Sequence, residues 1–302
     1  PLWGLDGSEA TLIAARENAV YRVEGPDGPV ALRLHRSGYR TAAELRSELQ
    51  WMDAVKQGGL MVPEPVPALD GALLHEVDGV QVDVLAWLSG TPFAEEFPVQ
   101  GTAERCEVFR QMGAQMALLH QVSDAWTPPA GFTRHAWDLD GLLGAVPVWG
   151  RFWDNPELSQ DDARLMRRVR ERASAELAST KDTLDFGLIH ADLVPDNVLV
   201  DGDTLRFIDF DDGGYGFRLF ELATTLLKFM PEPEYPRFKN ALIEGYTTRR
   251  RLNIGALDLF LLLRATTYVG WNITRMQEDG AQGRNTRFID TARTLALTYL
   301  NT

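Results

Sequence analysis

One polar segment constrains this chain more than any other part of it. Residues 190–197 read His-Ala-Asp-Leu-Val-Pro-Asp-Asn, and a carboxylate between apolar neighbours follows in Phe-Ile-Asp-Phe at 207–210. Short apolar runs at 186–189, 198–200 and 204–208 predict strands around both motifs, with a turn between the last two. The acids at these strand ends are therefore expected to face one cleft.

Three residues of this segment have the chemistry that phosphoryl transfer needs. A phosphoryl group in transfer is strongly anionic, so its enzyme needs oxygen ligands for Mg2+ and a carboxylate that orients the attacking hydroxyl. Asp192 and Asn197 are separated by four residues, which is the spacing of the kinase catalytic loop H-R-D-x-x-x-x-N. Asp192 is expected to accept the hydroxyl proton, and Asn197 and Asp209 to hold the metal. His190 is expected to be a buried structural hydrogen-bonding residue.

At these residues the chain resembles the aminoglycoside phosphotransferase and choline kinase-like family, which includes type II homoserine kinases and related bacterial Ser/Thr kinases of stress response. The family pattern H-x-D-x-x-x-x-N, then I-D-F, is met by residues 190–197 and 208–210, and Phe-Glu-Leu-Ala-Thr at 220–224 looks like its (D/E)-L-A helix. Residues 209–218 are similar to the homoserine kinase-like branch in particular. The resemblance is specific from about Leu188 to Thr224 and elsewhere rests on the order of elements.

The resemblance implies an α+β, two-lobed protein kinase-like fold with ATP and Mg2+ as cofactors. Residues 1–89 would form a nucleotide-binding lobe, an antiparallel sheet with one helix, and residues 90–302 a mainly helical lobe for catalysis and substrate binding. The patterns agree with this division. Strands are expected at 19–24, 29–35, 72–77 and 80–88 and a helix at 41–56, followed by helices at 103–120, 161–177, 217–229, 234–249, 256–278 and 287–300.

The same resemblance assigns the nucleotide contacts. Residues 16–21 look like the family's phosphate-covering loop, with Asn18 in it, and Arg33 takes the place of the lysine in the V-A-I-K strand. A guanidinium is a planar, permanently charged fork, so this exchange is not conservative. Glu48 matches the helix residue that pairs with the strand cation. The adenine edge would pair with the backbone of the hinge from Leu85 to Trp87.

The acceptor is expected to be a small molecule. Only eleven residues lie between Asp209 and Glu221, too few for the activation segment on which protein kinases dock a peptide. Asp211 and its neighbour Asp212 could contact a cationic substrate or the metals, or could be turn residues. A helix beside the acceptor pocket is implied at 263–275, where four side chains recur at helical spacing and an arginine could hold a substrate carboxylate. These residues are Arg264, Tyr268, Trp271 and Arg275.

Charge and composition bound the partners. A net charge of −13 argues against a nucleic-acid partner and favours a cationic acceptor, such as an amino alcohol, an aminoglycoside or an amino acid. The single cysteine fits a reducing compartment. No leader-like or membrane-spanning apolar run occurs, so the cytoplasm is expected.

Two other functions stay open from the sequence alone. A bacterial stress-type Ser/Thr protein kinase shares the catalytic loop, and Arg33 is compatible with a nucleotide-binding pseudokinase. The identity of the acceptor, the choice of ATP over GTP and the oligomeric state are open as well.

Overall fold

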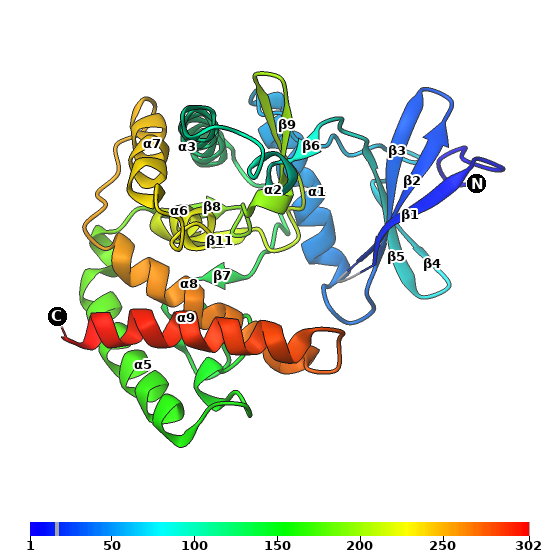
Figure 1. Cartoon of the computed structure of the whole chain (residues 1–302). Coiled ribbons are helices and arrows are strands. Elements are labelled where there is room, and N and C mark those ends of the chain that lie inside the picture. The colour runs from blue at the N-terminus through cyan, green and yellow to red at the C-terminus, as the bar shows by residue number, and fades with distance from the viewer. Residues whose placement is uncertain (16–17, 302) are drawn as a thin grey trace.

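The computed structural model describes residues 1–15 and 18–301 and has two lobes, a sheet-based one and a mainly helical one (Figure 1). Arg16 and Glu17 of the expected phosphate-covering loop lie outside the described residues. The N-terminal sheet is antiparallel throughout, with the strand order β1-β2-β3-β5-β4. Its strands are β1 (Ala10–Ala15), β2 (Asn18–Gly25), β3 (Gly28–His35), β4 (Leu74–Val77) and β5 (Val80–Ala86).

The edge strand β1 was not expected from the sequence. All six of its residues are exposed, so it lacks the alternation of buried and exposed positions that marks a half-buried strand. Pairing with β2 creates it, and the register shifts between Leu12 and Ala14. The strand is therefore a product of tertiary pairing rather than of a local pattern.

The helix α1 (Ala42–Gln57) lies between the sheet and the helical lobe (Figure 1). It begins at a capping box in which Thr41 and Glu44 satisfy each other's backbone N–H groups. The apolar positions that predicted the helix, from Leu45 to Val55, are buried. Because α1 contacts both β4 and α3, it forms a bridge from one lobe to the other.

The second lobe is mainly helical, as expected. Its α-helices are α2 (Phe93–Glu96), α3 (Thr102–Ala125), α4 (Leu139–Leu143), α5 (Gln160–Thr180), α6 (Arg218–Leu227), α7 (Tyr235–Thr247), α8 (Leu257–Trp271) and α9 (Ala281–Asn301). Four short 3-10 helices accompany them: η1 (Phe152–Asp154), η2 (Lys181–Thr183), η3 (Pro195–Asn197) and η4 (Asn272–Arg275). None of the helices in the described residues is long and apolar enough to cross a membrane.

The expected helix at 256–278 extends too far, because its last seven residues lie outside α8. The α-helix ends at Trp271 and continues as η4, and Gly280, with a φ of +72°, marks the turn into α9. Arg275 therefore lies beyond the end of α8 and does not share one α-helical face with Arg264. The helix α9 also begins earlier than expected, at Ala281.

Two small sheets support the catalytic segment. One joins β10 (Thr204–Phe207), β9 (Val198–Asp201) and β6 (Thr91–Pro92), and the other joins β7 (Ala136–Trp137), β11 (Gly214–Phe217) and β8 (Phe186–Ile189). The strand β11 was not expected from the sequence, which suggested turn residues at Asp211 and Asp212 and a helix from residue 217. Its glycines are needed because a Cβ on Gly214 would come within 2.4 Å of the His135 carbonyl oxygen. The missing side chain allows close strand packing.

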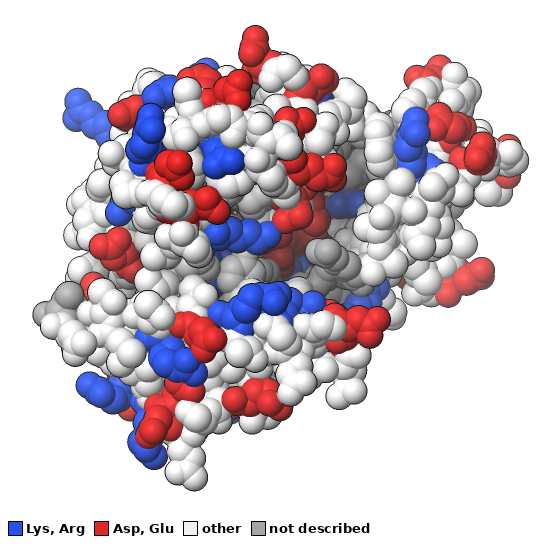
Figure 2. Space-filling view, in the orientation of Figure 1, with Lys and Arg blue, Asp and Glu red and all other residues white. Residues whose placement is uncertain are grey.

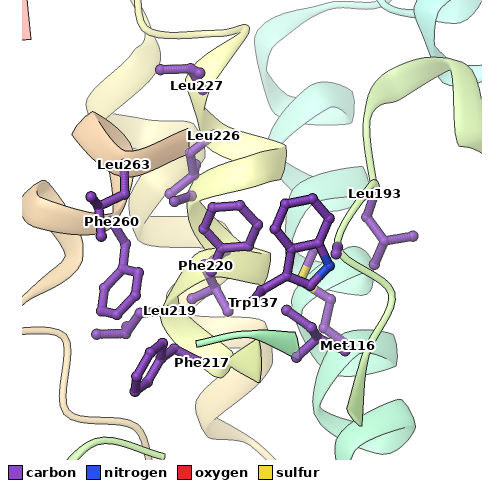
Figure 3. Close-up of a cluster of buried hydrophobic side chains, with 14 of the residues drawn as sticks. Met116, Trp137, Leu193, Phe217, Leu219, Phe220, Leu226, Leu227, Phe260 and Leu263 are labelled. Carbon is purple, nitrogen blue, oxygen red and sulfur yellow. The ribbon is translucent and has the colours of Figure 1, made fainter. Parts of the chain in front are cut away.

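The core of the helical lobe lies directly behind the catalytic segment. Figure 3 shows Trp137, Phe220 and Phe217 packed with leucines of α6 and α8. The rings of Trp137 and Phe220 are stacked with centroids 5.3 Å apart, and every residue of α6 is buried. This packing gives the strand ends a rigid support.

Histidine 120 makes the stability of the lobe sensitive to acid. Its ring is fully buried on α3 and bonds the Tyr246 hydroxyl at 2.7 Å, and burial, followed by Arg218 and Arg250, lowers its pKa well below the ordinary value. Below about pH 6.5 an unfolded chain gains a proton here that the folded chain does not, so folding weakens as the pH falls. Relative to His120→Gln, the wild type should lose about 1.4 kcal/mol per pH unit in this range. Denaturant melts of both proteins between pH 7.5 and 5.5 would measure it, and parallel curves would contradict it.

Candidate active site

A carboxylate from α6 holds the backbone of the catalytic loop in place. Ala191 has a φ of +63°, which is uncommon for a residue with a side chain. The buried carboxylate of Glu221 accepts the backbone N–H groups of His190 (3.0 Å) and Ala191 (2.6 Å). This pair of hydrogen bonds stabilises a strained conformation beside the functional residue. In the sequence, Glu221 was recognised only as part of a helix motif.

His190 has the structural role that was expected. Its ring is fully buried, Nε2 bonds the Ile208 carbonyl at 3.0 Å, and the Asp192 backbone N–H reaches Nδ1 at 3.3 Å. Burial lowers its pKa to about 4. The neutral ring therefore joins the loop to the strand end that carries Asp209.

Asp192 reaches the cleft with both carboxylate oxygens held. Arg264 Nη2 donates to its Oδ1 at 2.7 Å, and Asn197 Nδ2 donates to its Oδ2 at 3.0 Å. The side chain is 22% exposed. Burial raises its pKa to about 7, and Arg264 opposes that rise. A carboxylate fixed in this way can orient a hydroxyl group and accept its proton.

The residues expected to hold a metal fit a divalent cation. The Asn197 amide nitrogen donates to Asp192, which leaves the amide oxygen of Asn197 for another partner. Asp209 has a φ of +67°, and burial, then Asp211 and Asp192, raise its pKa well above the usual range. The buried Asp211 Oδ1 lacks a hydrogen-bond partner among the described residues. Converging carboxylates with one unpartnered oxygen are an environment that a cation would stabilise.

A complete protein cage for a metal is not built here. The described residues contain no group of three or more His, Cys, Asp or Glu side chains suited to one. Mg2+ commonly uses one or two carboxylates together with phosphate oxygens and water. Asn197 and Asp209 match that partial set.

Asp211 and Asp212 differ in their surroundings. The Asp212 carboxylate accepts hydrogen bonds from Arg40 (3.1 Å) and from the Trp149 indole (3.3 Å). Asp211 is 5% exposed, lines the cavity, and burial raises its pKa to about 7. Both also form the turn that their sequence suggested. Asp211 is therefore the carboxylate with more capacity for a bound cation.

Arg33 is held by a partner that the sequence did not reveal. Its Nε and Nη2 donate to the two oxygens of Asp83 at 2.7 and 2.8 Å, and its Nη1 donates to Glu48 at 2.8 Å. The pairing with Glu48 is the one expected. Asp83 lies opposite Arg33 in the β3–β5 register and also bonds His35, whose other ring nitrogen contacts Asn18. An acid within the apolar run of β5 was the only signal for this pairing.

Replacing Arg33 with lysine should weaken both stability and nucleotide binding. One ammonium cannot reproduce the fork that spans Asp83 and Glu48, so buried carboxylate oxygens lose donors. The expected cost is about 2 kcal/mol of unfolding free energy, with a rise in the Kd for ATP. Chemical denaturation and calorimetric titration would measure both. Arg22→Lys, on an exposed pair with Glu24, is the matched control, and equal behaviour of the two variants would contradict the prediction.

The expected substrate residues divide into two groups. Tyr268 and Trp271 line the cavity. Arg264 is fully buried, with its guanidinium over the rings of Trp149 (4.5 Å) and Tyr268 (4.4 Å). Its Nη2 donates to Asp192 and to the Tyr268 hydroxyl (3.0 Å). Arg275 is buried as well and donates to the Trp271 carbonyl at 3.1 Å. Arg264 is therefore already paired, and its role towards a substrate stays a prediction.

One cavity of about 1440 Å³ is lined by residues from both lobes. On the sheet side it is lined by Asn18, Arg33 and the expected hinge from Leu85 to Trp87. Its floor has Asp192, Asn197, Asp209 and Asp211, and its far wall comes from α8 and α9. Figure 2 shows the hollow between the lobes, with acidic side chains in its depth and basic ones at its mouth.

A cleft between a five-stranded antiparallel sheet and a helical lobe, with a carboxylate positioned for a hydroxyl group, defines a kinase-type phosphotransferase. The chain belongs to the phosphotransferase enzyme family, whose model matches residues 9–254. A homoserine kinase of Sinorhizobium medicae is 28% identical over 270 residues, covering 87% of this chain and 76% of the relative.

Solved structures agree with this assignment. The microcompartment-associated aminopropanol kinase has a TM-score of 0.85 and 29% identity, covering 98% of this chain and 93% of that one. An amicoumacin kinase in complex with AMP-PNP and Ca2+ has a TM-score of 0.76 at 19% identity, covering 96% and 90%. These similarities confirm the α+β protein kinase-like fold. The chain is an ATP-binding kinase of this family with an alcohol group as acceptor and a small molecule as substrate.

Proposed function

We propose that this chain uses ATP and Mg2+ to phosphorylate a hydroxyl group on a small molecule that also contains an amine. The observation that carries the proposal is the placement of Asp192. Its carboxylate is held by Arg264 and Asn197 and faces the cavity that the hinge, the acids and the aromatic wall share. A hydroxyl bound there would lie beside both a proton acceptor and the expected phosphate position.

The roles of the individual residues follow from this arrangement. Asp192 orients the acceptor hydroxyl and takes its proton as the hydroxyl oxygen bonds to the γ-phosphorus of ATP, whose bond to the bridging oxygen breaks so that ADP leaves. Asn197 and Asp209 hold Mg2+, which when bound neutralises charge on the phosphate oxygens. Arg33, kept in place by Asp83 and Glu48, presents its remaining N–H groups towards the phosphates. The backbone of residues 85–87 receives the adenine edge.

An amine on the acceptor is favoured by an acidic group on the cavity, whose far end is aromatic. Trp149, Tyr268, Trp271 and Phe288 form an aromatic wall there, with ring centroids 4.9 to 6.5 Å apart. Arg264 already lies over the faces of Trp149 and Tyr268, and Arg275 and Arg284 lie over that of Trp271. The group on this cavity that would attract an ammonium is therefore the Asp211 carboxylate. The homoserine and aminopropanol kinases among the relatives are named for acceptors that carry both an amine and a hydroxyl.

Phosphorus NMR would test the proposal. The protein with ATP and Mg2+ is offered three matched pools: amino alcohols such as aminopropanol, hydroxy amino acids including homoserine, and the corresponding alcohols without an amine. A phosphomonoester signal from an amine-containing pool, lost in Asp192→Asn, is expected. Signal from the amine-free pool alone would remove the amine from the proposal.

Two results would point to the alternative functions. Phosphate on added protein, with none on small molecules, would indicate a stress-type protein kinase. ATP binding without transfer to any pool would indicate a nucleotide-binding pseudokinase. The short segment between Asp209 and Glu221 and the structural relatives favour the small-molecule kinase.

A further inference from the structure

One fully buried arginine on the helical lobe contacts both lobes. Arg134 lies just before β7, and its side chain is completely shielded from solvent. Its Nη1 reaches α1, donating to the Glu48 carboxylate at 3.3 Å and to the Glu44 carbonyl at 3.1 Å. None of the catalytic roles above uses this residue.

The same guanidinium also binds the turn that follows Asp209. Nη2 donates to the carbonyls of Asp211 (2.6 Å) and Phe210 (3.1 Å), and Nε donates to that of Gly213 (2.5 Å). Within the turn, the Gly213 N–H closes on the Phe210 carbonyl at 2.9 Å. Charge-assisted bonds to three carbonyls therefore anchor a backbone that begins at the left-handed residue Asp209.

Glu48 connects this anchor to the nucleotide strand. One carboxylate oxygen bonds Arg33 at 2.8 Å and the other bonds Arg134 at 3.3 Å, and Glu48 is itself completely buried. A continuous chain of buried charge thus runs from Asp83 and Arg33 on the sheet, through Glu48, to Arg134 and the turn. Buried ion pairs are sensitive to the loss of one member.

We propose that Arg134 is a positioning residue that couples nucleotide binding on the sheet to metal binding at Asp209. The inference rests on the proposed function. A nucleotide phosphate that holds Arg33 in one position also holds Glu48. Through Arg134 it then holds the turn that orients Asp209. Because coupling is reciprocal, a metal bound at Asp209 tightens nucleotide binding by the same factor.

The test measures binding without turnover. Mn2+ replaces Mg2+, and free Mn2+ is followed by electron paramagnetic resonance with and without AMP-PNP. After subtraction of the Mn2+ that AMP-PNP binds in a protein-free titration, the ratio of the two dissociation constants of protein-bound Mn2+ is the coupling factor. The variants are Arg134→Ala, Arg134→Lys and Glu48→Gln. Arg170→Ala is the matched control, because Arg170 also donates to a carbonyl, that of Leu143 at 2.8 Å, and stacks on Trp153 away from the cavity.

In Arg134→Ala, the coupling factor should fall on the order of tenfold, while AMP-PNP binding without metal stays near the wild-type value. Added guanidinium ion should restore part of the coupling, since it can fill the space left by the side chain. Glu48→Gln should lower the coupling too, and adding Arg134→Ala to it should cause little further loss. Arg170→Ala should behave as the wild type does.

The outcomes separate this inference from the proposed function. Wild-type protein that binds no Mn2+ with AMP-PNP would overturn both. Wild-type coupling that persists in Arg134→Ala would overturn the inference alone. If Arg134→Ala does not fold, Arg134→Lys decides, because an ammonium cannot serve three carbonyls and Glu48 together, and wild-type coupling in that variant would overturn the inference.

Discussion

Exchanging Asp192 for asparagine is expected to lower kcat by roughly 10²- to 10⁴-fold and to leave the Kd for ATP close to its wild-type value. Asparagine keeps the shape of the side chain and can still accept a hydrogen bond from Arg264, which approaches Oδ1 at 2.7 Å. It cannot accept the proton of an attacking hydroxyl. The loss should therefore appear in turnover and not in nucleotide binding.

Steady-state kinetics and calorimetric titration of ATP would measure the two parts separately. Asp196→Asn is a suitable control, because Asp196 is exposed in the same loop and pairs with Lys228 at 2.8 Å. The control should keep a kcat within a few-fold of the wild type. Wild-type turnover in Asp192→Asn would remove the proton-accepting role from Asp192.

The exchange of Asp209 for asparagine should abolish most metal-dependent activity and at the same time stabilise the metal-free protein. Asparagine tolerates the left-handed backbone at this position, where φ is +67°. Removing the carboxylate costs several kcal/mol of metal-dependent stabilisation of the transition state. This corresponds to a fall in kcat on the order of a thousandfold. It also removes a buried charge and its repulsion from Asp211 and Asp192, and these are the effects that raise the pKa of Asp209, burial first.

The stability change has the opposite sign to that of ordinary structural damage. Without metal at pH 7, the variant should gain on the order of 1 kcal/mol, seen as a higher Tm by calorimetry. Titration with Mn2+ should show weaker binding of the metal–nucleotide complex. A lower Tm together with lower activity would mean that the turn, rather than the ligand, was lost.

Local patterns predicted the elements that depend on neighbouring residues. The helix α1 follows from a 3.6-residue apolar repeat, and β8, β9 and β10 follow from short apolar runs with a turn between the last two. The strands β1 and β11 were missed because each exists through its pairing partners. The exposed β1 has no pattern of its own, and the glycines of β11 look like a turn until β7 and β8 close on them.

The site divides in the same way. The spacing of Asp192, Asn197 and Asp209 is readable in the sequence because one loop and one strand end carry all three. The side chains that hold the site in place come from other parts of the chain. Glu221 bonds the backbone of the catalytic loop, Arg264 bonds Asp192, and Asp83 bonds Arg33. No local spacing joins such pairs, so side-chain type alone did not reveal them.

Residue types and their spacing were enough to predict the class of chemistry, since the catalytic residues lie in one short stretch whose backbone must place them together. How these residues are held and what they face depends on packing between distant elements. Packing brings Arg134 between Glu48 and the Asp209 turn, buries Arg264 behind Asp192, and places an aromatic wall across the cavity. Those contacts depend on how helices and strands close over one another, which residue spacing does not encode.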